Sequence, residues 1–247
     1  MTLGIVFAMV LLVAILFTLG WPRIHFPRQP SLEGIEDRQA AQAYDRISRW
    51  PQFRALRWMI VRKLGEYQPS GALADIGCGP GLLTTLIAQT CPHLRVLGLD
   101  TADEMIRTAA ANASSLGLSQ RVEFRKGDVG SLPLSDASLD FAVSTLSLHH
   151  WSDASRGLTE IHRVLKPGGQ LLLFDLRRDP RRFFYWLLRF GQAFIVPTAL
   201  SRINEPVGSV LASYTPAELE GLFARSPFGQ CKVQAGLGWV FVWGKKA

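Results

Sequence analysis

The chain has 247 residues, enough for one α/β domain with a full hydrophobic core and not obviously for two. Hydrophobic residues make up 48% of the chain and the mean hydropathy is +0.14, both high for a soluble enzyme, and much of the excess lies in residues 3–19 and 183–199. The net charge of +7 is concentrated in residues 22–63 and 177–189, but no basic helix or aromatic platform accompanies it, so nucleic acid is not an expected partner. The three cysteines are odd in number and lack metal-ligand spacing, which argues against a disulfide framework and against a metal site.

The N-terminal segment has the composition of a membrane span. Residues 2–21 contain no charged side chain, and about 20 apolar residues cross a bilayer core of about 30 Å as a helix. Trp21 stands where an interfacial aromatic residue is expected, and basic residues follow it. The alternative is a cleaved signal peptide, but the segment has no basic start and a poor cleavage site. We expect a transmembrane anchor at 1–21, a juxtamembrane linker at 22–34, and a domain at 35–247 that faces the cytoplasm.

Downstream, helical and extended segments alternate at short intervals. Residues 35–64 are predicted to be helical with a break before Pro51, and Thr101 and Glu104 have the spacing of a capping box for a later helix. Further helices are expected at 82–89, at 154–165 and from Pro216, with a turn at 166–169. Strands are expected at 72–75, 95–99, 122–125, 139–144, 170–175, 232–235 and 239–243. This order predicts an α/β fold with a mostly parallel seven-stranded sheet covered by helices on both faces.

A glycine-rich loop follows the first predicted strand. Gly77, Gly79 and Gly81 let the backbone turn sharply and approach a ligand closely. The loop falls at the carboxyl end of a strand, where open α/β sheets bind ligands. A dinucleotide-binding loop would need glycine in place of Leu82, and Pro80 removes one amide donor, so a nicotinamide-dependent reductase is only an alternative.

Four ordered motifs resemble the class I S-adenosylmethionine-dependent methyltransferases, particularly the small-molecule branch with the ubiquinone and menaquinone C-methyltransferases (the methyltransferase type 11 domain). The motifs are 75–81, 96–105, 127–136 and 161–174. The resemblance covers about residues 40–176 and, more loosely, 213–246. Four motifs in order are more specific than a lone glycine loop. The resemblance implies a Rossmann-like fold, S-adenosyl-L-methionine as the cofactor, and methyl transfer to a small acceptor.

The resemblance also implies roles for individual residues. Asp100 would accept hydrogen bonds from the ribose hydroxyls of the cofactor, or it is an ordinary acid at a helix start. Asp128 would accept from the adenine amino group, with the amide of Val129 donating to the ring. Met105 would pack on the adenine face, although core packing explains its position equally well. Asp75 would lie near the methionine end of the cofactor. The remaining expected cofactor-binding residues are Gly77, Cys78, Gly79, Gly81, Thr101 and Leu146.

The catalytic residue is left open by the sequence. Methyl transfer from a sulfonium depends largely on positioning and exclusion of water, and a base is needed only when the nucleophile must lose a proton. His149 is a candidate base because it follows the fourth strand beside His150. The resemblance implies the alternative, since in the small-molecule branch such a histidine pair is mostly a structural feature of this turn. No Asn-Pro-Pro-Tyr-like motif follows that strand, which argues against methylation of nucleobase or amide nitrogens.

Residues 177–212 form an aromatic-rich insertion. Phe183, Trp186, Phe190 and Phe194 would share one helical stripe, while charged and breaking residues argue against a second membrane span. Residues 181–197 are predicted to lie at a membrane interface, and the alternative is a substrate lid that packs on its own domain. The expected acceptor is therefore hydrophobic or membrane-partitioned. A second alternative is a module that binds the cofactor without catalysis.

Overall fold

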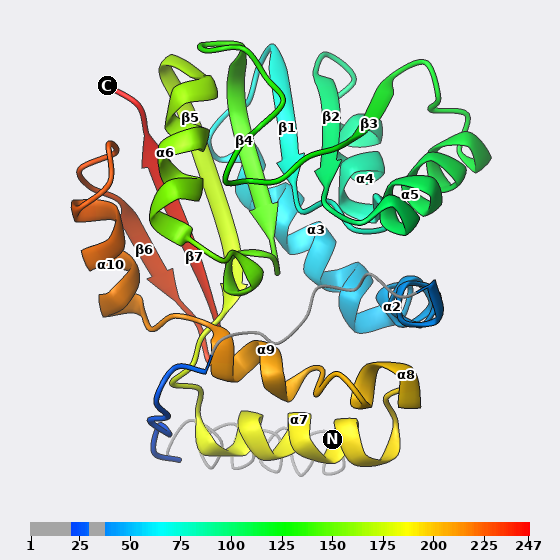
Figure 1. Cartoon of the computed structure of the whole chain (residues 1–247), viewed down its shortest axis with the longest axis vertical. Helices are drawn as coiled ribbons and strands as arrows, with labels where there is room; N and C mark the ends of the chain where they lie inside the picture. Colours follow the sequence, from blue (N-terminus) through cyan, green and yellow to red (C-terminus); the bar gives the residue numbers. More distant parts are fainter. Residues whose placement is uncertain (1–20, 30–37) are drawn as a thin grey trace, which may run out of the picture.

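The computed structural model describes residues 21–29 and 38–247, and these form a seven-stranded sheet with the order β3-β2-β1-β4-β5-β7-β6 (Figure 1). The first five strands are parallel, and β7 is antiparallel to both β5 and β6. The bounds are β1 Ala72–Ile76, β2 Arg95–Asp100, β3 Val122–Lys126, β4 Leu139–Thr145, β5 Leu165–Leu176, β6 Lys232–Ala235 and β7 Trp239–Lys245. The expected Rossmann-like class I architecture is confirmed.

Helices bury both faces of the sheet, as expected for strands that are apolar on both sides. Leu158 of α6 and Phe223 of α10 pack with Ala74 on one face. Ile60 of α3 and Ile87 of α4 pack with Leu73 on the other. The helix bounds are α2 Arg38–Ser48, α3 Pro51–Gly65, α4 Leu82–Thr90, α5 Asp103–Ser115, the 3-10 helix η1 Leu148–His150, α6 Ala154–Val164 and α10 Pro216–Ala224. Pro216 takes the first position of α10 as predicted, and the structure adds a capping box between Thr215 and Glu218.

The insertion forms three helices at the edge of the sheet where the parallel strands end (Figure 1). These are α7 Arg182–Phe194, α8 Thr198–Ser201 and α9 Val207–Ala212, which we call the lid. α8 packs on α2 and α9 packs on η1. The lid therefore covers the end of the sheet at which α/β proteins bind ligands.

The base of the lid is tied to the N-terminal residues that the structure describes. Arg177 makes a bidentate, buried pair with Asp179, with N–O distances of 2.7 and 2.6 Å. The amide of Ile24 donates to the carbonyl of Pro180 at 3.1 Å, and the Arg181 guanidinium donates to the carbonyl of Trp21 at 2.9 Å. Trp21 is thus held beside the start of α7.

Two local predictions are wrong. Thr101 does not cap α5; Ala102 occupies that position without a side-chain cap, and its amide donates to Asp100 instead. Residues 166–169 do not form a separate turn. They are part of β5, which starts at Leu165, and they lie where the register of its pairing with β4 shifts. At residues 166–169 the pairing of β5 with β4 outweighs the local turn signal.

The predicted anchor at residues 1–21 lies outside the described residues except for Trp21. Within 21–29 and 38–247, no helix combines the length and hydrophobicity that a bilayer crossing requires. In α7, only Tyr185 is fully buried, whereas Phe183, Trp186, Leu187, Phe190 and Phe194 are 40–75% exposed, as is Ile195 just beyond it.

Candidate cofactor and acceptor site

The glycine loop turns tightly between β1 and α4. Gly77, Gly79 and Gly81 all have positive φ angles, of 74°, 52° and 71°. The amides of Gly77 and Cys78 both donate to the carbonyl of Leu99, at 2.8 and 2.9 Å, which ties the loop to β2. At Gly81 a Cβ would lie 2.8 Å from that of Ala109, so α5 approaches the loop as closely as glycine allows.

Asp100, the last residue of β2, faces this loop. One carboxylate oxygen accepts from the amide of Gly79 at 2.8 Å, and the other accepts from the amide of Ala102 at 3.0 Å. Burial raises the pKa of Asp100, and the backbone hydrogen bonds only partly offset this. Each carboxylate oxygen has two acceptor positions, so the group can still receive two ribose hydroxyls.

The space beside Gly79 fits a ligand that approaches the backbone. A Cβ on Gly79 would meet only the ring of Tyr44, at 3.7 Å, whereas one on Gly77 would collide with Ser147. The Asp100 carboxylate and the Tyr44 ring therefore both lie beside Gly79, whose own amide is already bonded to Asp100. A carboxylate acceptor next to an aromatic ring suits the nucleoside part of S-adenosyl-L-methionine.

The predicted adenine-side residues lie farther along the same edge. Met105 is 3% exposed and packs with Ala41, Ala102 and Tyr44. This packing agrees with the alternative that Met105 is a core residue, although the cluster borders the glycine loop. Asp128 is exposed and accepts from the amide of Gly130 at 2.7 Å. The remaining residues are Val129, partly buried against the core; Thr101, exposed after Asp100; Cys78, buried under the loop; and Leu146, whose φ is 53°.

Asp75 lies beneath the loop rather than on its surface. It is 1% exposed, and one carboxylate oxygen accepts from the hydroxyl of Thr84 at 2.6 Å. Burial raises its pKa to about 7, more than the Thr84 hydrogen bond lowers it. The structure therefore places Asp75 as a support of the loop.

Tyr44 on α2 connects the loop to the lid, and the sequence analysis did not identify it. Its ring packs with Met105 and lies beside Gly79. Burial raises its pKa to about 12, and the nearby carboxylates of Glu205 and Asp100 add to the effect. Tyr44 is thus a neutral hydroxyl between the cofactor loop and the lid. A helix of mixed composition gives no local signal for this role.

His149 and Asp175 form a buried pair at the ends of β4 and β5. Nδ1 of His149 lies 2.7 Å from the Asp175 carboxylate, and both side chains are less than 5% exposed. The His150 ring packs on that of His149 at 4.1 Å, and burial lowers the pKa of His150 to about 3. Asp175 and the partly buried Glu205 were both missed by the sequence analysis. For Asp175 a signal existed, because it is an acid at the end of a strand, as Asp100 is.

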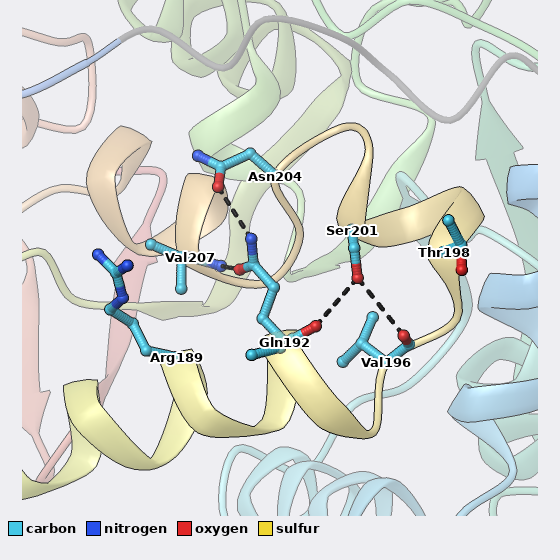
Figure 2. Close-up of a pocket in the computed structure, with 8 residues that line it drawn as sticks. Arg189, Gln192, Val196, Thr198, Ser201, Asn204 and Val207 are labelled. Carbon is cyan, nitrogen blue, oxygen red and sulfur yellow. Dashed lines mark hydrogen bonds between the residues drawn. The ribbon is translucent and has the colours of Figure 1, made fainter.

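The lid contains a cavity of about 460 Å³ (Figure 2). The side chain of Gln192 on α7 bridges it, accepting from the amide of Val207 and donating to Asn204, both at 3.0 Å. The hydroxyl of Ser201 donates to the Gln192 carbonyl at 3.1 Å. The other lining residues are Arg189, Ala193, Val196 and Thr198. Asn204 lines the cavity. The next residue, Glu205, lies near enough to His149 for that side chain to lower the pKa of Glu205, although burial raises it overall.

Comparison with known proteins agrees with this geometry. Residues 74–173 match the family model described as a methyltransferase domain. The chain is 28% identical over 200 residues to a demethylmenaquinone methyltransferase of Thermus thermophilus, covering 77% of this chain and 90% of that protein. It is 29% identical to one of Porphyromonas gingivalis, covering 85% and 86%. An uncharacterized protein of a Streptomyces fradiae transposon is 39% identical over 130 residues, but this chain covers only 37% of its length.

Solved structures share the fold. A SAM-dependent methyltransferase from Aquifex aeolicus superposes with a TM-score of 0.62 at 21% identity, covering 85% of this chain and 99% of that one. A putative S-adenosylmethionine-dependent methyltransferase from Methanococcus maripaludis gives 0.67 at 20% identity, covering 89% and 97%. Motifs, sheet order and relatives agree, and they confirm both the resemblance and the expected cofactor. Residues 74–173 are a methyltransferase domain of type 11, in a chain that has the fold of the S-adenosylmethionine-dependent methyltransferases.

Proposed function

We propose that this chain transfers the methyl group of S-adenosyl-L-methionine to a small lipophilic acceptor that partitions into a membrane. The observation that carries the transfer step is the position of the Asp100 carboxylate and the Tyr44 ring, which both lie beside Gly79 in the glycine loop. Relatives named demethylmenaquinone methyltransferase, which this chain covers almost fully, support a lipophilic, quinone-like acceptor.

The cofactor supplies an electrophilic methyl on a sulfonium, and the protein's own residues supply binding, orientation and exclusion of water. The Asp100 carboxylate and the Tyr44 ring would hold the nucleoside part. The lid, which packs on α2 and on η1, would shield the reacting groups from water. Positioning of this kind can supply much of the rate enhancement of an in-line displacement.

The lid also supports access from a membrane. The exposed side of α7 carries Phe183, Trp186, Leu187 and Phe190 beside Arg189, the pattern of a helix that lies in a bilayer interface. Trp21 packs on Phe183 with ring centroids 6.4 Å apart, and it directly follows the uncharged segment 2–20. An anchor formed by that segment would enter the bilayer beside α7. We propose that both face one anionic lipid surface on the cytoplasmic side, since basic residues flank each.

Transfer is tested with purified full-length protein, methyl-labelled cofactor and a total lipid extract, with products read by mass spectrometry. We expect a labelled lipophilic product and micromolar or tighter binding of S-adenosylhomocysteine by calorimetry, with no binding of NADH. Binding without any labelled product would indicate a cofactor-binding module without catalysis. Equal methylation of water-soluble acceptors would contradict the membrane-partitioned class.

Lipid contact of α7 is tested by fluorescence quenching in anionic vesicles that contain brominated lipid. Trp186 on α7 and Trp58 on α3 are equally exposed, at 56% and 55%, which makes them a matched pair. Replacing Trp186 with Phe should remove a quenched component of the emission, and replacing Trp58 with Phe should remove an unquenched one. Equal quenching of the two variants would contradict the proposed docking.

A further inference from the structure

The cavity between the helices of the lid carries positive charge. Among the described residues that line it, Arg189 is the one with a charged side chain, and none is an acid. Gln192, Thr198, Ser201 and Asn204 add amide and hydroxyl groups, and the remaining residues are apolar. Its volume of about 460 Å³ falls within the range of about 300–1,000 Å³ that is usual for small-molecule sites. The cavity therefore has the size of a ligand site and a cationic lining.

A chain of hydrogen bonds fixes the direction in which the side-chain amides point. The backbone nitrogen of Val207 can only donate, so the Gln192 atom that it contacts at 3.0 Å must be the amide oxygen. The amide nitrogen of Gln192 is then the atom that contacts Asn204, also at 3.0 Å. Because that nitrogen donates, the Asn204 atom in the contact must be its oxygen. The Asn204 nitrogen is thereby directed away from Gln192.

Two hydrogen-bond donors of the cavity have no partner in the part of the chain that the structure describes. The amide nitrogen of Asn204 makes no hydrogen bond there. The Arg189 guanidinium makes no hydrogen bond or ion pair there, and its one contact of this kind is with the Trp186 ring, 5.8 Å from the centroid. Figure 2 shows the Asn204 nitrogen and the Arg189 guanidinium on the same side of Gln192. Both groups only donate, so together they suit an anionic acceptor.

The position of the cavity on α7 indicates which anion. Trp186 and Phe190 lie on either side of Arg189 in the helix and are 56% and 57% exposed. Tryptophan side chains at a membrane interface lie at the level of the lipid head groups. If α7 lies in such an interface, Arg189 is at the depth of the lipid phosphates. A guanidinium can donate two parallel hydrogen bonds to a phosphate group, and these are stronger than neutral ones.

We propose that the lid cavity binds the phosphate of an anionic phospholipid head group, with Arg189 and Asn204 as its donors. This inference rests on the membrane contact in the proposed function and names the partner of the lid in that contact. Arg189 belongs to α7, and Asn204 belongs to the segment between α8 and α9. A head group held by both would join the two parts of the lid that the Gln192 side chain already bridges. Bound lipid should therefore stabilise the lid over the end of the sheet.

Lipid binding is measured on the full-length chain in a neutral detergent, by native mass spectrometry. The probes are dioctanoyl phosphatidylglycerol and dioctanoyl phosphatidylcholine, which share the phosphate but differ in net charge. We expect the Kd for phosphatidylglycerol to be lower by about 10-fold or more, because the choline group cancels the charge that the guanidinium recognises. Other basic residues also attract anionic lipid, so the comparison between variants decides the site.

Two substitutions in the cavity test the donors. Arg189→Gln should raise the Kd for phosphatidylglycerol by about 10-fold, as expected for the loss of a hydrogen bond to a charged group. Asn204→Asp keeps the oxygen that Gln192 contacts and replaces the outward nitrogen with a negatively charged oxygen. This variant should also lose the lipid, while its unfolding midpoint and its Kd for S-adenosylhomocysteine stay unchanged.

The matched control is Arg202→Gln. Arg202 is an exposed arginine at the end of α8 in the same lid, and it does not line the cavity. This variant should bind phosphatidylglycerol as the wild-type chain does. Equal losses in Arg189→Gln and Arg202→Gln would indicate general attraction between basic residues and lipid, and would overturn the inference. Unchanged binding in Asn204→Asp would overturn it as well.

Further outcomes identify a different occupant or separate the inference from the proposed function. Equally tight binding of inorganic phosphate, or displacement of the lipid by decyl-ubiquinone, would assign the cavity to free phosphate or to the methyl acceptor and overturn the lipid. Methyl transfer and a quenched Trp186 without any retained phosphatidylglycerol would overturn the lipid site alone. Retained lipid that depends on Arg189 and Asn204, without any methylated product, would support the lipid site and count against the proposed transfer.

Discussion

The carboxylate of Asp100 and the amide of Gly79 are 2.8 Å apart, which joins the end of β2 to the middle of the glycine loop. Through this contact one residue both shapes the loop and presents acceptor atoms beside it. Asp100 and Gly79 are 21 positions apart in the chain, and parallel pairing of β1 with β2 brings them together.

Replacement of Asp100 by Asn should weaken cofactor binding. The amide group has one acceptor oxygen in place of two, so it cannot serve the Gly79 and Ala102 amides and two ribose hydroxyls together. Hydrogen bonds to a charged group are worth about 1.5–3 kcal/mol, which predicts a rise of about 10-fold or more in the Kd for S-adenosylhomocysteine. Calorimetry measures this Kd, and the control is the Asp136→Asn variant, because the Asp136 side chain is exposed. A Kd within twofold of wild type would remove Asp100 from the binding site.

Replacement of Gly81 by Ala should destabilise the fold more than the same change at Gly117. Both glycines have φ near +70°, so both variants incur backbone strain of about 1–2 kcal/mol. At Gly81 the new Cβ would also lie 2.8 Å from Ala109 and 2.9 Å from Phe124, whereas nothing lies within 4 Å at Gly117. Overpacking adds about 1–3 kcal/mol at Gly81 alone. Urea denaturation measures the free energy of unfolding of both variants. Equal losses of stability in the two would show that the loop can move away from α5.

Replacement of Asp75 by Asn should make the free energy of unfolding less dependent on pH. The folded-state pKa of Asp75 is raised from 3.8 to about 7, so the wild-type chain loses stability as pH rises between these values, and the variant does not. Linkage predicts that the variant gains ~2.5 kcal/mol relative to wild type between pH 5 and pH 8. Urea denaturation at both pH values tests this, with Asp136→Asn controlling for the loss of a carboxylate. A pH-independent difference would mean that Asp75 is ionised throughout.

Local and periodic features of this protein were readable in its sequence. The glycine loop, the alternation of strands and helices, the acid that ends β2 and the proline start of α10 depend on neighbouring residues, because backbone freedom and burial pattern act over a few positions. The seven strands and the family follow from these features. Where a local signal competed with strand pairing, as at residues 166–169, the local prediction failed.

Tertiary structure alone decided how distant side chains meet. The ring of His149 and the carboxylate of Asp175 come together because β4 and β5 pair in parallel, so that their ends lie side by side. Tyr44 reaches Gly79, and Glu205 reaches the surroundings of His149, because α2 and the lid fold over the end of the sheet. No spacing in the chain encodes these contacts, since a side chain carries no local mark of a partner tens or hundreds of residues away. The sequence therefore identified the cofactor loop, while the acceptor side of the site emerged only from the packing of the folded chain.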